Sequence, residues 1–344
     1  MLRCCAVGFD DGRSVGLADE VAKCDTTMLA ELAQRHRVEA LVWDALEDTG
    51  ATLPDAVAAA LRGQSQFRQR QNLQSMAAVA ALRSEFAAGG IDFLLVKGHA
   101  TAALAYRNPM ARTGRDIDIL VTQDDVERAA ASLTRLGFEP TLPPGGHADW
   151  HRMHKESVWE RAGGLVLELH SSLVDNERLI PRIGMSSPRQ SVSVGSLQLE
   201  TLGPADLITY TAVHGSWCLW FRAKWIVDLA ALLWVRYGNA AADESLEMAW
   251  DAGAGRAASL GFLLAHQLFG TRLTPGLLDR LANDRILARL QHSTMTIMQT
   301  DEPTRRRFGT AGLRVNQLLL MPTTGAAVLE GARQAREVLG NRFV

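Results

Sequence analysis

The chain has 344 residues, of which 47% are hydrophobic and 22% are charged, as is typical of a soluble globular protein with two or three domains. Its net charge of −2 provides no overall positive field, so a nucleic acid is disfavoured as a partner. The four cysteines lack the spacing of a zinc site or a disulfide framework. The N-terminus lacks the apolar core of a signal peptide, and no apolar run reaches the ~18 residues of a membrane span, so we expect a cytoplasmic protein.

Helical patterns dominate residues 1–90. Residues 1–25 show little periodicity and are expected to form a loose arm. Apolar residues then recur at helical spacing from Thr27 to Leu46. The sequence Thr52-Leu53-Pro54-Asp55 is typical of a helix start, and the alanine-rich stretch after it predicts a long helix, or a pair of helices, that ends at Gly89-Gly90.

Short apolar segments alternate with helical ones in residues 91–200. Strands are expected at Ile91–Val96, from Asp116, at Ser157–Glu160 and at Leu165–His170, with helices at Ala100–Tyr106 and Asp124–Leu136 and a hairpin around Gly195-Ser196. After Gly203-Pro204 the chain is again helical through to Leu339. The expected fold class is α+β, in which an α/β core with a mixed sheet at 91–200 is flanked by helical regions at 1–90 and 201–344.

The most informative segment is Asp116-Ile117-Asp118-Ile119-Leu120-Val121, in which acids alternate with branched apolar residues. Side chains two apart on a strand point to the same face, about 6–7 Å apart, so both carboxylates project together. Two such carboxylates repel each other unless a cation lies between them. Hard oxygen ligands suit Mg²⁺, which commonly binds through one or two carboxylates and substrate phosphates. The segment therefore predicts phosphoryl or nucleotidyl transfer chemistry.

A third acid, Glu168, lies in the segment Leu165-Val166-Leu167-Glu168-Leu169-His170. Alternation places Glu168 and His170 on one face of a strand and the leucines on the other. An acid flanked by leucines needs a partner, and cations shared with Asp116 and Asp118 would supply one. His170 has two interpretations, a hydrogen-bonded core histidine or a residue of the site.

This ordered set of motifs resembles the nucleotidyltransferase superfamily of the DNA polymerase beta type, and more narrowly the bacterial family of uncharacterised nucleotidyltransferases. The resemblance covers roughly residues 30–240. It rests on Val96-Lys97-Gly98, Tyr106, Arg112, Asp116-Ile117-Asp118-Ile119-Leu120-Val121, Leu136-Gly137-Phe138, Glu168-Leu169-His170, Gly203-Pro204-Ala205-Asp206, His214 and Lys224-Trp225-Ile226-Val227-Asp228-Leu229.

The resemblance implies a minimal nucleotidyltransferase core and a metal-dependent enzyme. Asp116, Asp118 and Glu168 would be catalytic and would hold two Mg²⁺ ions. A nucleoside monophosphate would pass from a nucleoside triphosphate, with ATP the expected donor, to an acceptor, and pyrophosphate would leave. The phosphates would be bound by Lys97, Gly98, His99 and Arg112. The sequence departs from the superfamily at His99, where a serine or glycine is usual, and in a longer interval between Gly98 and Asp116.

Other interpretations remain open at this point. The acceptor could be a small molecule, a peptide natural product or a protein, and a biosynthetic partner protein is conceivable. A degenerate, non-catalytic nucleotide-binding or scaffold protein is an alternative, as is a component of a toxin–antitoxin pair. His147, His151 and His154 lie close together and suggest a transition-metal site, although a loop or surface position is favoured because no Cys or acid completes the set.

Overall fold

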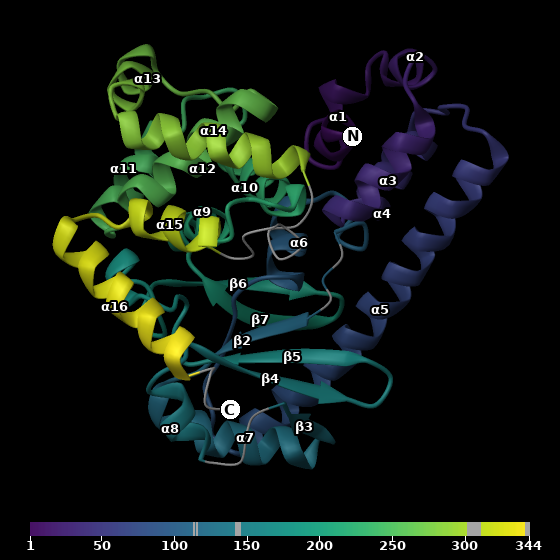
Figure 1. Ribbon diagram of the computed structural model, residues 1–344. Coiled ribbons are helices and arrows are strands. Elements are labelled where there is room, and N and C mark those ends of the chain that lie inside the picture. The colour runs from purple at the N-terminus through teal and green to yellow at the C-terminus, as the bar shows by residue number, and fades with distance from the viewer. Residues whose placement is uncertain (113, 115, 142–145, 301–310, 341–344) are drawn as a thin grey trace. The chain divides into compact units, whose positions relative to one another are not determined.

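The computed structural model describes residues 1–344 except 113, 115, 142–145, 301–310 and 341–344 (Figure 1). The chain forms two compact units. The first comprises Met1–Asp175 and Ile183–Leu207, and the second comprises Asn176–Arg182 and Ile208–Val344. The division into three regions at 1–90, 91–200 and 201–344 stays a prediction.

The first unit begins with helices, and its first residues differ from the loose arm that we expected. They form α1 (Leu2–Val7), the 3-10 helix η1 (Asp11–Ser14) and α2 (Leu17–Val21). Cys4 and Cys5 are buried, so hydrophobic contact holds a segment whose sequence shows little periodicity. The helices that follow are α3 (Thr26–His36), α4 (Glu39–Asp48) and the long α5 (Asp55–Ala88). Pro54 precedes α5, in agreement with the expected helix start.

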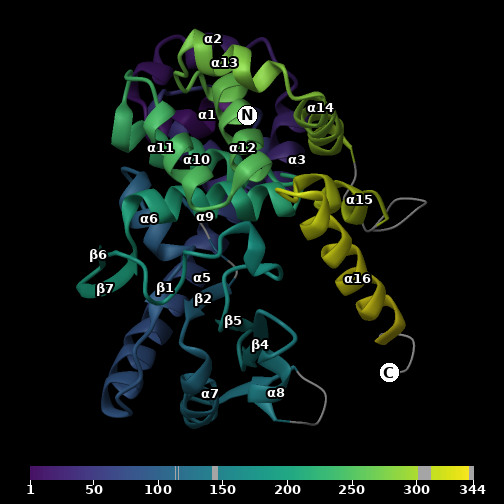
Figure 2. The ribbon, with the colours of Figure 1, turned by 90° about the vertical axis from the view of Figure 1, so that its left-hand side faces the viewer.

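A five-stranded mixed sheet lies at the centre of the first unit. Its strands are β1 (Leu94–Leu95), β2 (Asp116–Leu120), β3 (Phe138–Pro140), β4 (Glu156–Arg161) and β5 (Leu165–His170), in the order β1-β2-β5-β4-β3. The β2–β5 pair is parallel, and the other pairs are antiparallel. The separate hairpin of β6 (Arg189–Val194) and β7 (Leu197–Leu202) lies beside β1 (Figure 2). The expected α+β class and mixed sheet are confirmed.

One face of this sheet forms the core. Ile117, Ile119, Leu167 and Leu169 lie on it and are at most 1% exposed. They belong to a cluster with residues of α5 and of α7 (Val126–Arg135), which follows the 3-10 helix η2 (Gln123–Asp125). Burying each such side chain stabilises the fold by roughly 1.5–3 kcal/mol. The strict alternation of these strands leaves the acidic residues on the opposite face.

The short helices α6 (His99–Ala105) and α8 (His147–His151) complete the first unit. The second unit is helical, as expected for the end of the chain. Its elements are η3 (Glu177–Leu179), the larger part of α9 (Pro204–Trp217), α10 (Ala223–Tyr237), α11 (Asp243–Asp251), α12 (Gly255–Phe269), α13 (Pro275–Ala282), α14 (Arg285–Gln299), α15 (Ala311–Leu320) and α16 (Thr324–Gly340). Within the described ranges, no helix is both long and apolar enough to cross a membrane.

Candidate functional site

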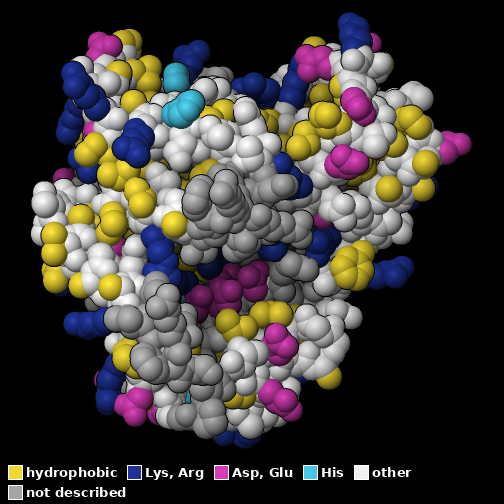
Figure 3. Space-filling view, in the orientation of Figure 1, with side chains coloured by type: hydrophobic (Ala, Val, Ile, Leu, Met, Phe, Trp, Pro, Cys, Tyr) yellow, Lys and Arg dark blue, Asp and Glu magenta, His cyan; other side chains and the backbone are white. Residues whose placement is uncertain are grey.

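Strand register brings the acidic residues of β2 and β5 together. Asp118 pairs with Glu168 across the parallel β2–β5 ladder, and Asp116 pairs with Val166. Residues paired in this way project to the same face of the sheet. The sequence expectation that these acids share a face therefore agrees with the register. In the space-filling view, acidic side chains gather over the part of the first unit where Figure 1 draws β2 and β5 (Figure 3).

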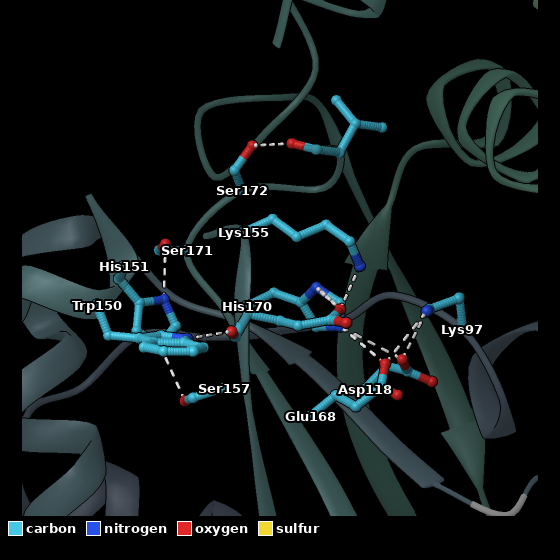
Figure 4. Close-up of polar contacts among 12 residues, drawn as sticks. Lys97, Asp118, Trp150, His151, Lys155, Ser157, Glu168, His170, Ser171 and Ser172 are labelled. Carbon is cyan, nitrogen blue, oxygen red and sulfur yellow. Dashed lines mark hydrogen bonds and ion pairs between the residues drawn. The ribbon is translucent and has the colours of Figure 1, made fainter. Parts of the chain in front are cut away.

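Asp118, Glu168 and His170 form a compact group of possible metal ligands. One donor atom from each residue lies within 4.8 Å of the others. Nε2 of His170 is 3.3 Å from Oδ1 of Asp118 and 3.4 Å from Oε2 of Glu168 (Figure 4). Asp116 lies two residues before Asp118 on the same face and is half-buried. The group therefore includes two of the three expected acids together with His170.

Lys97 supplies a cation to the two carboxylates. It follows β1, and its Nζ lies 2.6 Å from Oδ1 of Asp118 and 3.6 Å from Oε2 of Glu168 (Figure 4). The Lys97 side chain is only 17% exposed and that of Asp118 only 5% exposed, so water screens the pair weakly. The ammonium group of Lys97 thus offsets the negative charge of the two carboxylates.

These contacts shift the proton affinities of the group in opposite directions. Burial is the largest influence on Asp118 and favours its neutral form, yet Lys97 and the hydrogen bonds from His170 and Glu168 outweigh it and hold the pKa of Asp118 well below its usual range. Burial and the charge of Asp118 raise the pKa of Glu168. Burial lowers the pKa of His170, but its hydrogen bonds to Asp118 and Glu168 outweigh burial and raise it. Asp118 is therefore the firmly ionised member, while Glu168 and His170 hold protons more readily.

A glycine-lined loop approaches the acids through the backbone. Gly98 adopts φ +57° and ψ −110°, a conformation that side-chain-bearing residues rarely take. A Cβ on Gly114 would lie 3.4 Å from the carbonyl oxygen of Asp116, 3.9 Å from Cα of Gly98 and 3.7 Å from Nη1 of Arg112. The Arg112 guanidinium therefore lies beside this backbone, as a phosphate contact would require.

Asn72 of α5 holds this loop, and sequence reasoning did not identify it. Its Nδ2 donates to the carbonyl oxygens of Met110 and Arg112, each at 3.4 Å, and its Oδ1 accepts from the backbone N–H of Gly114 at 3.4 Å. The side chain is buried, so these contacts are shielded from water. A polar residue at a buried position of a helix is the only signal that the sequence offers for this role.

His99 is buried at the start of α6 and contacts the hydroxyl of Ser75 on α5 through Nε2. Burial, followed by the positive charge of Arg112, lowers the pKa of His99 to about 4. The imidazole is therefore neutral at neutral pH. Its role in binding phosphate, expected from its place in the glycine motif, stays a prediction.

The three histidines considered as a transition-metal site have separate partners. Nδ1 and Nε2 of His151 lie 2.8 Å and 2.9 Å from the hydroxyls of Ser171 and Ser157. His147 stacks on Trp159, and His154 stacks on Trp150. His151 is thus a buried histidine between two hydroxyls rather than a surface residue, and burial lowers its pKa to about 4.

Glu156 and Lys155 extend the charged group to β4, and sequence reasoning missed both. Glu156 pairs with His170 in the β4–β5 ladder, and its Oε2 lies 3.2 Å from Nδ1 of His170. Nζ of Lys155 forms an ion pair with the same carboxylate oxygen of Glu156. The register of two antiparallel strands, which no local motif specifies, brings Glu156 to the site.

The chain is similar to known proteins chiefly at the level of a family. The sequence profile of a family described as uncharacterised nucleotidyltransferase matches residues 23–270. Among solved structures, the chain is similar to an antigenic nucleotidyltransferase-like protein from Paracoccidioides brasiliensis, with 15% identity and a TM-score of 0.36 over 59% of this chain and 94% of that one. No curated protein matches the chain. Because the family profile covers most of the sequence, the chain belongs to the uncharacterised nucleotidyltransferase family.

Proposed function

We propose that the protein transfers a nucleoside monophosphate from a nucleoside triphosphate to an acceptor in a reaction that depends on divalent cations. The observation that carries this proposal is the convergence of Asp118 and Glu168 on a single point, with an ammonium group between them. Membership of a nucleotidyltransferase family supports it. A scaffold protein has no need of buried carboxylates that face one another, because such an arrangement costs stability.

The residues present fit divalent cations. Asp118 and Glu168 are oxygen donors, His170 adds a nitrogen, and Asp116 lies on the same face of β2. In our proposal Asp116, Asp118 and Glu168 hold two Mg²⁺ ions. When bound, such ions neutralise phosphate charge and lower the pKa of an acceptor hydroxyl.

The remaining groups bind the donor and handle the proton. Gly98 lets the backbone approach the triphosphate, and Arg112 offers a planar fork of donors beside it. Lys97 exchanges its carboxylate partners for phosphate oxygens. The acceptor oxygen forms a bond to the α-phosphorus as the bond from that phosphorus to the bridging oxygen breaks, and pyrophosphate leaves. A carboxylate oxygen of Glu168 accepts the hydroxyl proton.

The donor is expected to be ATP, and the acceptor to be a small molecule, a peptide or a protein. An α-labelled nucleoside triphosphate, incubated with the protein, Mg²⁺ and fractionated extract, should transfer label to an acceptor with release of pyrophosphate. Asp118→Asn should abolish the transfer. Glu139→Gln, which changes an exposed acid of β3, should retain it. Labelling that persists in Asp118→Asn would contradict the proposal.

A further inference from the structure

His170 lies between two sets of carboxylates. Its imidazole is fully buried at the end of β5. Nε2 faces Asp118 and Glu168 at 3.3 Å and 3.4 Å, while Nδ1 lies 3.2 Å from Oε2 of Glu156 on the other side of the ring (Figure 4). Both ring nitrogens therefore face carboxylate oxygens, and the three acidic residues come from three adjacent strands.

In the metal-free protein, Nε2 of His170 shares a proton with Asp118 and Glu168. An ion at this point would displace that proton and leave the one N–H of the neutral imidazole on Nδ1, where it faces Glu156. Nδ1 is buried and has no aligned hydrogen-bond partner within the described ranges, so the carboxylate that faces it is the acceptor in reach. A proton on Nδ1 leaves the lone pair of Nε2 directed towards oxygens of Asp118 and Glu168. Nε2 and the two carboxylate oxygens then face one point, and a cation bound there would offset the repulsion among their lone pairs.

The separations of Nε2 from the two carboxylate oxygens match those of neighbouring ligands on one ion. With metal–ligand bonds of about 2.1 Å, neighbouring ligands lie about 3.0 Å apart at octahedral angles and about 3.4 Å apart at tetrahedral angles. The two distances from Nε2, 3.3 Å and 3.4 Å, lie at the upper end of this range. Nζ of Lys97, which contacts the same two oxygens, occupies the neighbourhood that an ion would take.

We propose that Nε2 of His170 is a direct ligand of the metal ion held by Asp118 and Glu168, and that Glu156 is the positioning residue that sets its tautomer. This inference rests on the proposed function and revises the identity of one of its two ions. A shell of two carboxylates and an imidazole favours a divalent transition ion over Mg²⁺, because imidazole nitrogen suits such ions while Mg²⁺ prefers oxygen alone. The ion that accompanies the triphosphate remains Mg²⁺.

Electron paramagnetic resonance of Mn²⁺ tests this directly, since bound Mn²⁺ reports coupling to a coordinated imidazole nitrogen. The full-length protein is titrated with Mn²⁺ alone and with Mn²⁺ plus a non-hydrolysable ATP analogue. The wild type should show imidazole-nitrogen coupling and bind Mn²⁺ at least about tenfold more tightly than Mg²⁺ in competition. His170→Gln should lose the coupling, and the control His154→Asn should keep it.

The Glu156→Gln variant keeps His170 as the metal ligand but replaces the carboxylate that orients its imidazole. Loss of such a partner typically weakens metal binding about 10–100-fold, so the dissociation constant of Mn²⁺ should rise by that factor. Circular dichroism and urea unfolding establish that each variant is folded. Mn²⁺ that binds through Asp118 without nitrogen coupling would overturn this inference and leave the proposed function standing. Absence of divalent-ion binding, with and without the nucleotide analogue, would overturn both.

Discussion

Replacement of Lys97 by methionine should destabilise the metal-free protein and increase its response to metal. Nζ of Lys97 lies 2.6 Å from Asp118, and the two side chains are 17% and 5% exposed. At an effective dielectric constant of about 20, the Coulomb attraction at this distance is about 6 kcal/mol. The variant also avoids the cost of burying an ammonium group. We therefore expect a net loss of about 3 kcal/mol in the free energy of unfolding, the size seen when one partner leaves a buried ion pair.

Urea unfolding at pH 7 measures this loss, first in a chelator and then in millimolar Mg²⁺ or Mn²⁺. In Lys97→Met a divalent ion replaces the missing charge without first displacing an ammonium group, so metal should restore most of the lost stability and stabilise the variant more than the wild type. Lys155→Met is the matched control. It removes a similarly buried cation that pairs with Glu156, and it should not gain the larger metal response.

Two results would refute this reasoning. If Lys97→Met were as stable as the wild type in the chelator, then the buried acids would not depend on the lysine for their charge balance. If metal stabilised both proteins equally, then Lys97 and the ion would not compete for Asp118 and Glu168. Either result would remove the physical basis for a cation site at this point.

Three further outcomes follow from the loop and helix beside the acids. The pKa of His99 is about 4 in the folded state and 6.5 ordinarily, so the unfolded chain binds the proton first, and the wild type should lose up to about 3 kcal/mol of stability as pH falls from 6.5 to 4. In chemical unfolding, the stability of His99→Gln should depend less on pH than that of the wild type, and equal pH profiles would refute this reasoning. Gly98→Ala should lower the free energy of unfolding in urea by about 1–3 kcal/mol, because the backbone at this position has a φ of +57°. The control Gly63→Ala, which lies in open space within α5, should be neutral or stabilising, and a neutral Gly98→Ala would exclude strain at Gly98. Asn72→Ala should weaken binding of an ATP analogue in calorimetry, since its amide holds the loop at Gly114, and unchanged affinity would contradict that role.

The sequence predicted the part of the site that depends on local periodicity. Alternation within β2 and β5 is a property of single strands, so it placed Asp118 and Glu168 on polar faces without knowledge of the fold. The parallel register that makes them neighbours comes from the pairing of β2 with β5, which the sequence did not predict. The long helix α5 and the hairpin β6–β7 were likewise signalled by a start motif and by a glycine turn.

The rest of the site depends on contacts between segments that are distant in the sequence. Lys97 meets Asp118 because β1 pairs with β2, and Glu156 meets His170 because β4 pairs with β5. Neither strand pairing is signalled by a local motif in the sequence around these residues. The first helices were missed for a related reason, since α1 has only six residues and is too short to show periodicity. The short strand β3 contains Pro140, which argues against a strand when read alone.

The most direct test of the account is thermal stabilisation by each nucleoside triphosphate, with and without Mg²⁺, in the wild type and in Asp118→Asn. It requires no knowledge of the acceptor, because a ligand that binds the folded state raises the apparent stability by mass action. The account predicts a Mg²⁺-dependent rise in Tm with at least one nucleotide, lost in Asp118→Asn and retained in Glu139→Gln. No rise with any nucleotide, or an equal rise in Asp118→Asn, would contradict a nucleotide–metal site at these residues.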